Sequence, residues 1–158
     1  MKYNKSSVQR VLDELKSLNL PTQFKDLPQS TRTAREAAAA VNCHVGQIVK
    51  SLVFQTKSTH KPILVLTSGS NQVNEAVVGA VIGEAIDFAS AEFVREMTGF
   101  AIGGVSPFGL KEEIATYIDE DLLQHPVIWA AAGSPNAVFS ICPEDLVSAI
   151  QGQVITVV

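Results

Sequence analysis

The sequence predicts an α+β fold, a single domain with a mixed, largely antiparallel sheet and surrounding helices. The 158 residues are 46% hydrophobic and 18% charged, which is the composition of an ordinary globular chain with one core. Segments typical of strands outnumber the helices that could join parallel strands, and several follow one another across short turns. The chain shows no internal repeat, low-complexity tract or linker, so we expect one domain over residues 1–158.

The N-terminal part of the chain is predicted to form two helices. Apolar residues recur at helical spacing between Val8 and Leu18, which predicts the first. Thr33 and Glu36 have the spacing of a capping box, in which a Thr hydroxyl and a Glu carboxylate each satisfy a free backbone N–H of the other residue. An alanine-rich run follows as far as Asn42, and together these residues predict the second helix.

The middle of the chain is predicted to begin with an antiparallel hairpin. Its two strands are expected over residues 47–56 and 63–67, which are rich in β-branched and apolar residues and are joined by a short polar segment. Residues 73–82 have helical spacing and stop at a glycine. A short strand over residues 85–89 is expected to follow.

The remaining third is predicted to contain a long loop between helices and strands. Ser90 is expected to cap a helix over residues 91–98, and residues 99–109 follow as a loop with four glycines and one proline. A helix that starts at Pro143 is expected to reach residue 150. The predicted strands of this part cover residues 116–118, 127–131, 138–141 and 154–158.

Charge and composition exclude several classes of protein. Twelve Lys and Arg against sixteen Asp and Glu give a net charge of −4, the opposite of a broad duplex-binding surface, so any nucleic-acid contact should be small. No apolar run reaches the roughly 18 residues of a membrane span, and no apolar leader follows the N-terminus. We therefore expect a cytoplasmic protein, in which Cys43 and Cys142 are small buried side chains and not a disulfide.

Lys50 is the first candidate functional residue. On a strand it shares a face with Ile48, Leu52 and Phe54, so its ammonium projects from the more apolar face. Burying an unpaired charge costs several kcal/mol or lowers the pKa of the amine, and such a lysine therefore has a partner or a cleft. The alternative is an edge-strand lysine that extends to water and blocks aggregation.

The second and third candidates are both turns with small residues. In Gly103-Gly104-Val105-Ser106-Pro107, the paired glycines let the backbone approach a ligand and direct N–H groups at an oxyanion, while the proline stiffens the loop. In 131–136, Gly133 and Ser134 follow a strand and can form the floor of a pocket. Each has a purely structural alternative, because such turns are common connections.

The sequence contains no other motif for catalysis. The three histidines are far apart, and neither HExxH nor paired-cysteine spacing occurs, so no metal is predicted. A G-x-S-x-G elbow and a phosphate-binding Walker loop are also missing, and no covalent nucleophile is indicated.

Four segments together resemble the YbaK/EbsC family of prolyl-tRNA-synthetase-associated editing domains, in matching order and spacing from about residue 27 to residue 150. They are Thr33-Ala34-Arg35-Glu36-Ala37-Ala38, Gln47-Ile48-Val49-Lys50-Ser51-Leu52-Val53-Phe54, Ala89-Ser90-Ala91-Glu92 and Thr98-Gly99-Phe100-Ala101-Ile102-Gly103-Gly104-Val105-Ser106-Pro107-Phe108-Gly109.

The resemblance implies a function and a set of partners. It implies a partly barrel-like sheet and hydrolysis, in trans, of the ester between a wrong amino acid and the terminal ribose of tRNA. A ribose hydroxyl of the substrate would assist the attacking water, without a cofactor. The implied partners are the tRNA acceptor end and prolyl-tRNA synthetase, with no membrane and no predicted oligomeric state.

The resemblance also implies site residues. The family's invariant lysine falls on Lys50, and its GxxxP loop falls on residues 103–107. The predicted catalytic residues are Lys50, Gly103, Gly104 and Pro107, and the predicted substrate-binding residues are Thr31, Val105, Ser106, Gly133 and Ser134.

One departure from the family bears on specificity. Members that deacylate cysteinyl-tRNA tend to have an Asp in the strand before the last helix, where this chain reads Ala137-Val138-Phe139-Ser140. We therefore expect tRNA(Pro) carrying alanine, serine or threonine ahead of cysteine. Two other functions stay open: a non-catalytic module that retains the pocket to bind a tRNA end or a synthetase, and a small-molecule acyl hydrolase.

Overall fold

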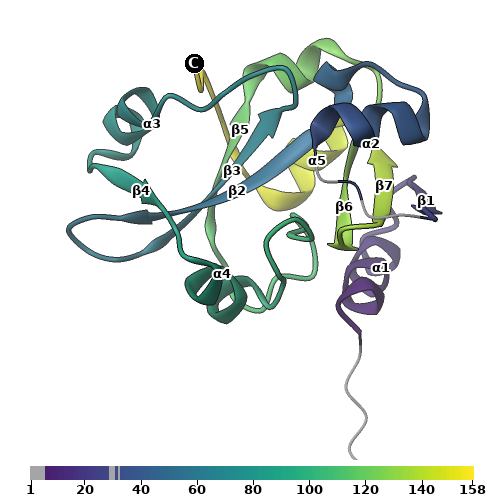
Figure 1. Ribbon diagram of the computed structural model, residues 1–158, viewed down its shortest axis with the longest axis horizontal. Coiled ribbons are helices and arrows are strands. Elements are labelled where there is room, and N and C mark those ends of the chain that lie inside the picture. The colour runs from purple at the N-terminus through teal and green to yellow at the C-terminus, as the bar shows by residue number, and fades with distance from the viewer. Residues whose placement is uncertain (1–5, 29–30, 32) are drawn as a thin grey trace, which may run out of the picture.

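A computed structural model describes residues 6–28, 31 and 33–158, and over these residues it has five α-helices and two β-sheets (Figure 1). The predicted α+β class is confirmed, and most strand pairs are antiparallel. The single predicted sheet is divided into two, and the described strands do not close into a barrel. The partly barrel-like sheet implied by the resemblance is therefore present as two separate sheets.

The larger sheet contains the predicted hairpin at its centre. Its strands, in spatial order, are β4 (Ile86–Phe88), β2 (Val49–Thr56), β3 (Pro62–Ser68), β5 (Ala115–Asp119) and β8 (Gln153–Ile155). β2 pairs antiparallel with both β3 and β4, which confirms the hairpin, whereas β5 is parallel to β3 and to β8. The carboxyl ends of β3 and β5 therefore meet at one edge of the sheet.

The smaller sheet joins distant parts of the chain. It has the order β1 (Gln23–Asp26), β7 (Ala137–Ile141) and β6 (Ile128–Ser134), with antiparallel pairs throughout. β1 is not predicted by the sequence, because its four residues are all exposed and show no apolar alternation. A bridge between Ile48 and Trp129 is where the two sheets touch.

The five α-helices match the predicted ones closely because their caps are explicit in the sequence. They are α1 (Ser7–Ser17), α2 (Ala34–Val41), α3 (Glu75–Ile82), α4 (Ala91–Thr98) and α5 (Pro143–Ile150). Thr33 and Glu36 form the predicted capping box of α2, and Ser90 caps α4. α3 begins two residues later than predicted because Asn74 is its N-cap. Two short 3₁₀ helices, Val45–Gln47 and Glu120–Gln124, are not predicted.

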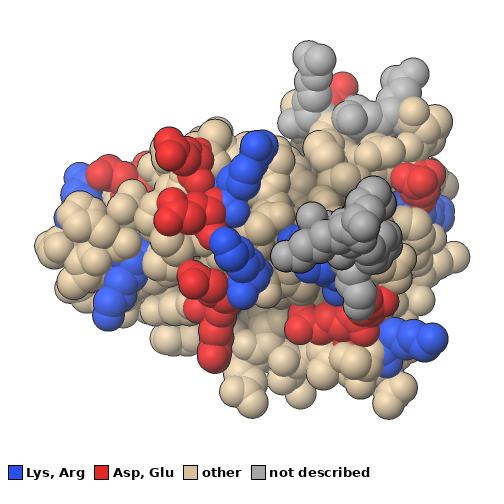
Figure 2. Space-filling view, turned by 90° about the horizontal axis from the view of Figure 1, so that it is seen from below, with Lys and Arg blue, Asp and Glu red and all other residues tan. Residues whose placement is uncertain are grey.

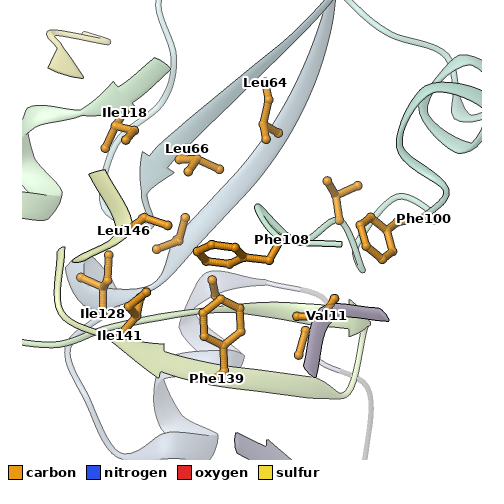
Figure 3. Packing of buried hydrophobic residues seen from close by; sticks show 14 of the residues in the cluster. Val11, Leu64, Leu66, Phe100, Phe108, Ile118, Ile128, Phe139, Ile141 and Leu146 are labelled. Atoms are coloured by element: carbon orange, nitrogen blue, oxygen red, sulfur yellow. The ribbon is translucent and has the colours of Figure 1, made fainter. Parts of the chain in front are cut away.

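The main core lies between the sheets and fixes the glycine-rich loop 99–109. Phe100 and Phe108 from this loop are fully buried among residues of α1, β3, β6 and β7. The rings of Phe108 and Phe139 lie next to each other (Figure 3). They meet edge to face with their centroids 5.8 Å apart. Phe100 and Phe108 therefore anchor the loop in the core, while Ile102 between them stays exposed.

Two expectations on membranes and cysteines can be compared with the structure. Across the described residues, no helix combines the length and the apolar character needed to cross a bilayer. Cys43 and Cys142 are both free thiols, and each is only partly buried.

Candidate active site

The site is organised around an unpaired stretch of β2. β3 pairs with β2 along residues 49–55, but on the other side β4 pairs only with residues 54–56. At the opposite end, Ile48 forms the bridge to Trp129 of β6. Between these two contacts, the described strands leave the edge of β2 around Ser51 without a partner strand.

A cavity of about 790 Å³ covers this open edge. Its walls come from the start of α2, from β2, from the end of β4, from the loop 99–109, and from β6 with the turn that follows it. The predicted site residues Thr31, Lys50, Gly103, Val105 and Ser134 line it. The structure therefore brings together five residues from four separate segments of the chain.

Lys50 has both a partner and a cleft. Its Nζ donates a hydrogen bond to the main-chain oxygen of Asn71 at 2.5 Å, and the side chain borders the cavity while it is partly buried. Burial lowers the pKa of Lys50, and the negative charge of Asp119 opposes this shift. The ammonium is thus held in place at the cavity wall and is not an edge lysine that extends freely into water.

A buried acidic residue, Asp119, interacts electrostatically with Lys50. Asp119 is 1% exposed and accepts hydrogen bonds from the Ser68 N–H (3.0 Å), the Asn71 side-chain amide (2.8 Å) and the Asp121 N–H (2.9 Å). These bonds fix the segment after β3 that carries the Lys50 acceptor. Sequence reasoning misses Asp119, because its nearness to Asn71 depends on the parallel pairing of β3 with β5.

Gly103 and Gly104 are glycines for two different structural reasons. Gly103 has a φ of +92°, and a Cβ there would be 4.0 Å from the nearest atom, the Pro135 Cγ. Gly104 lies against the backbone of Ser134, where a Cβ would come within 2.9 Å of the Ser134 Cα. The Gly104 N–H donates to the Ala101 oxygen at 2.9 Å, so this amide is already engaged within the loop.

Four predicted site residues do not line the cavity. Gly104 and Ser106 lie in the loop but outside the cavity lining. Ser106 is fully buried, and its Oγ accepts a hydrogen bond from the Phe108 N–H at 3.2 Å within the loop. Pro107 borders a separate hollow of about 390 Å³. Gly133, at φ +101°, accepts a hydrogen bond from the Ser7 Oγ at 2.7 Å.

The charge of the cavity is positive although the chain is acidic. Among the described residues that line it, the charged ones are Lys50 and Arg35. On the face shown in Figure 2, acidic and basic side chains are interspersed over the part of the chain that is described. The two cationic lining residues favour an anionic group at the cavity.

The cavity also has an apolar mouth and wall that the sequence does not single out. Phe88 and Ile102 line it while each is 59% exposed, and Trp129 lines it with Lys25 above its ring at 5.2 Å. Apolar residues of this kind carry no motif, and only their convergence in space assigns them to a site. Within the described residues, no three His, Cys, Asp or Glu side chains gather as metal ligands.

Comparison with known proteins points to one family. The model of the aminoacyl-tRNA editing domain matches residues 28–149. These residues include β2, the strands β4 and β6 on either side of its open edge, the loop 99–109 and the turn after β6.

Three known proteins illustrate the similarity. A solved structure described as "a putative trans-editing enzyme for prolyl tRNA synthetase" is 42% identical and superposes with a TM-score of 0.88 over 98% of each chain. An Enterococcus faecalis protein named "Putative Cys-tRNA(Pro)/Cys-tRNA(Cys) deacylase EbsC" is 25% identical over 77% of this chain and 74% of its own. A proline–tRNA ligase from Bacillus licheniformis is 38% identical over 57% of this chain, which corresponds to 16% of the ligase.

Proposed function

Because this chain belongs to the aminoacyl-tRNA editing domain family, we propose that it is a trans-editing deacylase. Its substrate is mischarged tRNA, specifically tRNA(Pro) carrying a small noncognate amino acid. Prolyl-tRNA synthetase is the enzyme that would release this substrate, in the cytoplasm.

The observation that carries the proposal is the positive cavity over the open edge of β2. A volume of about 790 Å³ lies within the range of about 300–1,000 Å³ that suits small-molecule ligands. The acceptor end of tRNA is anionic and ends in an adenosine ester. Lys50 and Arg35 supply the positive charge for the phosphate, and the apolar lining accepts the base and the amino-acid side chain.

The proposed reaction is the hydrolysis of an ester. The oxygen of a water molecule attacks the carbonyl carbon of the aminoacyl group, and the bond from that carbon to the ribose oxygen breaks. The ribose oxygen receives the proton, so the products are a free amino acid and tRNA with a free terminal hydroxyl. The vicinal ribose hydroxyl orients the water, Lys50 holds the acceptor end, and the loop 103–107 shapes the site around the ester.

The proposed specificity for a small amino acid rests on the lining of the cavity. Ala130, Ala131 and Val138 line the cavity with small or apolar side chains that offer no hydrogen bond, beside Trp129 and Ser134 of the same sheet. Such a wall distinguishes one methylene by about 1–3 kcal/mol. Because residues 137–140 lack the Asp of family members that deacylate cysteinyl-tRNA, we place alanine, serine and threonine ahead of cysteine.

A panel of one tRNA(Pro) body that carries Ala, Ser, Thr, Cys or Pro tests the proposal. The expected result is that at least one small noncognate ester is cleaved much faster than in buffer, while the prolyl ester survives. Exclusive cleavage of the cysteinyl ester contradicts the specificity, and rapid cleavage of the prolyl ester contradicts proofreading. Tight tRNA binding without turnover indicates a binding module, and hydrolysis of simple amino-acid esters indicates an acyl hydrolase.

Replacing the vicinal ribose hydroxyl by hydrogen tests the proposed assistance by the substrate. The expected result is a loss of deacylation with acceptor-end binding retained. Hydrolysis at the same rate without that hydroxyl would assign activation of the water to the protein.

A further inference from the structure

We propose that the main chain of Ser51 binds the aminoacyl group as a neighbouring strand would. The Ser51 N–H donates to the carbonyl oxygen of the ester, and the Ser51 C=O accepts from the α-ammonium group. This inference rests on the proposed function and assigns the reacting part of the substrate to the open edge of β2.

The direction of the Ser51 backbone follows from its neighbour two residues later. The Val53 oxygen accepts a hydrogen bond from the Ala89 N–H at 3.1 Å, so it points away from β3 and toward β4. In an antiparallel strand the N–H and C=O of one residue point to the same side, and residues two apart share that side. The N–H and C=O of Ser51 therefore point away from β3 as well.

No described strand meets these two groups. β4 ends at Phe88, which is paired with Phe54, and the bridge to β6 lies at Ile48. Ser51 lines the cavity at the gap between them. On this side no described strand is paired opposite its backbone groups, and its Oγ is buried without a hydrogen-bond partner among the described residues. Unpaired polar groups in a part-buried position are costly unless water or a ligand satisfies them.

The chemistry of an aminoacyl ester matches this edge. A residue of a partner strand offers one N–H and one C=O, separated by its Cα, to the corresponding pair of the residue opposite. An aminoacyl ester retains this arrangement, because its α-ammonium and its carbonyl oxygen flank the same carbon. A phosphate group offers acceptors only and cannot pair with the Ser51 C=O.

The pairing has a consequence for the reaction. Negative charge develops on the carbonyl oxygen as water attacks, and an N–H already aimed at that oxygen stabilises it. The Gly104 N–H is engaged with the Ala101 oxygen, whereas the Ser51 N–H lies where no described strand is paired with β2, between the contacts with β4 and with Trp129. Removal of one such donor lowers the rate by about 100- to 1,000-fold.

Amide hydrogen exchange in the unaltered protein tests the contact. The probe is 3′-amino-3′-deoxyadenosine carrying alanine through an amide, which cannot be hydrolysed as an ester. Exchange of the Ser51 amide is expected to slow at least about tenfold with this probe and to stay unchanged with adenosine alone. Unchanged Ser51 exchange, when shifts of the Gly103 resonance show that the probe is bound, overturns the inference.

A pair of variants tests the effect on the rate. Ser51→Pro removes the N–H at an edge position where a strand tolerates proline, and Ser51→Ala removes the same hydroxyl but keeps the N–H. Turnover of Ser51→Pro is expected to be at least about 100-fold below that of Ser51→Ala. Equal turnover of the two variants overturns the inference. If Ser51→Pro does not fold, the exchange measurement on the unaltered protein decides.

The two proposals can fail separately. Wild-type protein that hydrolyses no mischarged tRNA contradicts the proposed function, while protection of Ser51 by the probe would still support the contact. Deacylation with an unprotected Ser51 keeps the proposed function and overturns the contact.

Discussion

Lys50 occupies a part-buried position, where burial disfavours the charged form of its amine. Its pKa is lowered by burial, Asp119 acts in the opposite direction, and the ammonium donates to a main-chain oxygen that the Asp119 hydrogen bonds hold in place. A lysine that served stability alone would gain nothing from this position. The arrangement fits a charge that is retained for a ligand.

Substitution of Lys50 should separate activity from stability. Lys50→Met is expected to lower deacylation by about 100-fold, because the charge that holds the acceptor end is lost. Its free energy of unfolding should stay the same or rise, since the part-buried ammonium is removed while Asp119 keeps its three hydrogen bonds. Deacylation assays and urea unfolding measure the two effects. Lys57→Met, at an exposed ion pair with Asp87 on the same hairpin, is the control, and a destabilised but active Lys50→Met protein would contradict the assignment.

The lowered pKa of Lys50 predicts how stability and activity depend on pH. Folding lowers the pKa of Lys50, so between the lowered value and the ordinary value of about 10.4 the unfolded chain binds more protons. The contribution of this group to stability therefore rises with pH in that window. Activity that needs the ammonium should fall as pH rises through the lowered pKa. The enzymatic rate after subtraction of spontaneous hydrolysis measures this limb, and its persistence in Lys50→Met would assign it to another group.

The two loop glycines should respond differently to alanine. Gly104→Ala would press a Cβ against the Ser134 backbone and should cost about 1–3 kcal/mol of unfolding free energy. Gly103→Ala has open space but a positive φ, and should cost about 1–2 kcal/mol. Urea unfolding compares them. A larger loss at Gly103 than at Gly104 would show that backbone conformation outweighs the close approach.

At the scale of elements, α1 holds both ends of the loop 99–109. The Arg10 guanidinium donates to the Gly99 oxygen at 2.9 Å and to the Gly109 oxygen at 3.4 Å, and it lies 5.1 Å from the centre of the Phe100 ring. Glu14 accepts a hydrogen bond from the Gly109 N–H at 2.8 Å. One face of α1 thus fixes a loop that lies about ninety residues later in the chain.

Removal of the Arg10 contacts should make the loop 99–109 less rigid. Arg10→Ala is expected to lower the unfolding free energy by about 1–3 kcal/mol and to speed amide exchange in the loop. Arg10→Lys should restore only part of the loss, because an ammonium lacks the planar fork that reaches both carbonyls. Lys16→Ala, on the exposed side of α1, is the control. Full recovery in Arg10→Lys would show that charge alone holds the loop.

The sequence predicts the local elements well and the long-range pairings poorly. Helices α2 and α4 have explicit caps at Thr33 and Ser90, so their limits can be predicted from a few residues. β1 has no apolar pattern, and its pairing with β7 is decided by packing of distant segments. For the site, Lys50 and the glycine loop have local signals, whereas Asp119 and the Ser51 edge emerge only from the strand order. Arg35 is assigned to the site only by the position of α2 beside the cavity.

For the whole molecule, the net charge of −4 limits how tRNA can be bound. With Lys50 and Arg35 as the two phosphate contacts, each worth about −0.7, the slope of log binding constant against log salt should be about −1.4. Arg35→Gln should reduce the slope to about −0.7. Filter binding of deacylated tRNA(Pro) across salt concentrations measures it. A slope steeper than about −4 would require a basic surface well beyond this cavity.

The cavity wall formed by β6 comes from a late part of the chain, so the site can be completed only after β6 has been synthesised. β7 follows β6 in the chain, pairs with β1 on its other side, and Ser7 of α1 contacts Gly133 across 126 positions. Such non-local pairings form late because a long loop must close first. A nascent chain released from the ribosome only as far as α4 has the hairpin and Lys50 but lacks the β6 wall. Co-translational folding therefore leaves Lys50 without an enclosed cavity until the smaller sheet has emerged and closed onto the N-terminal segment.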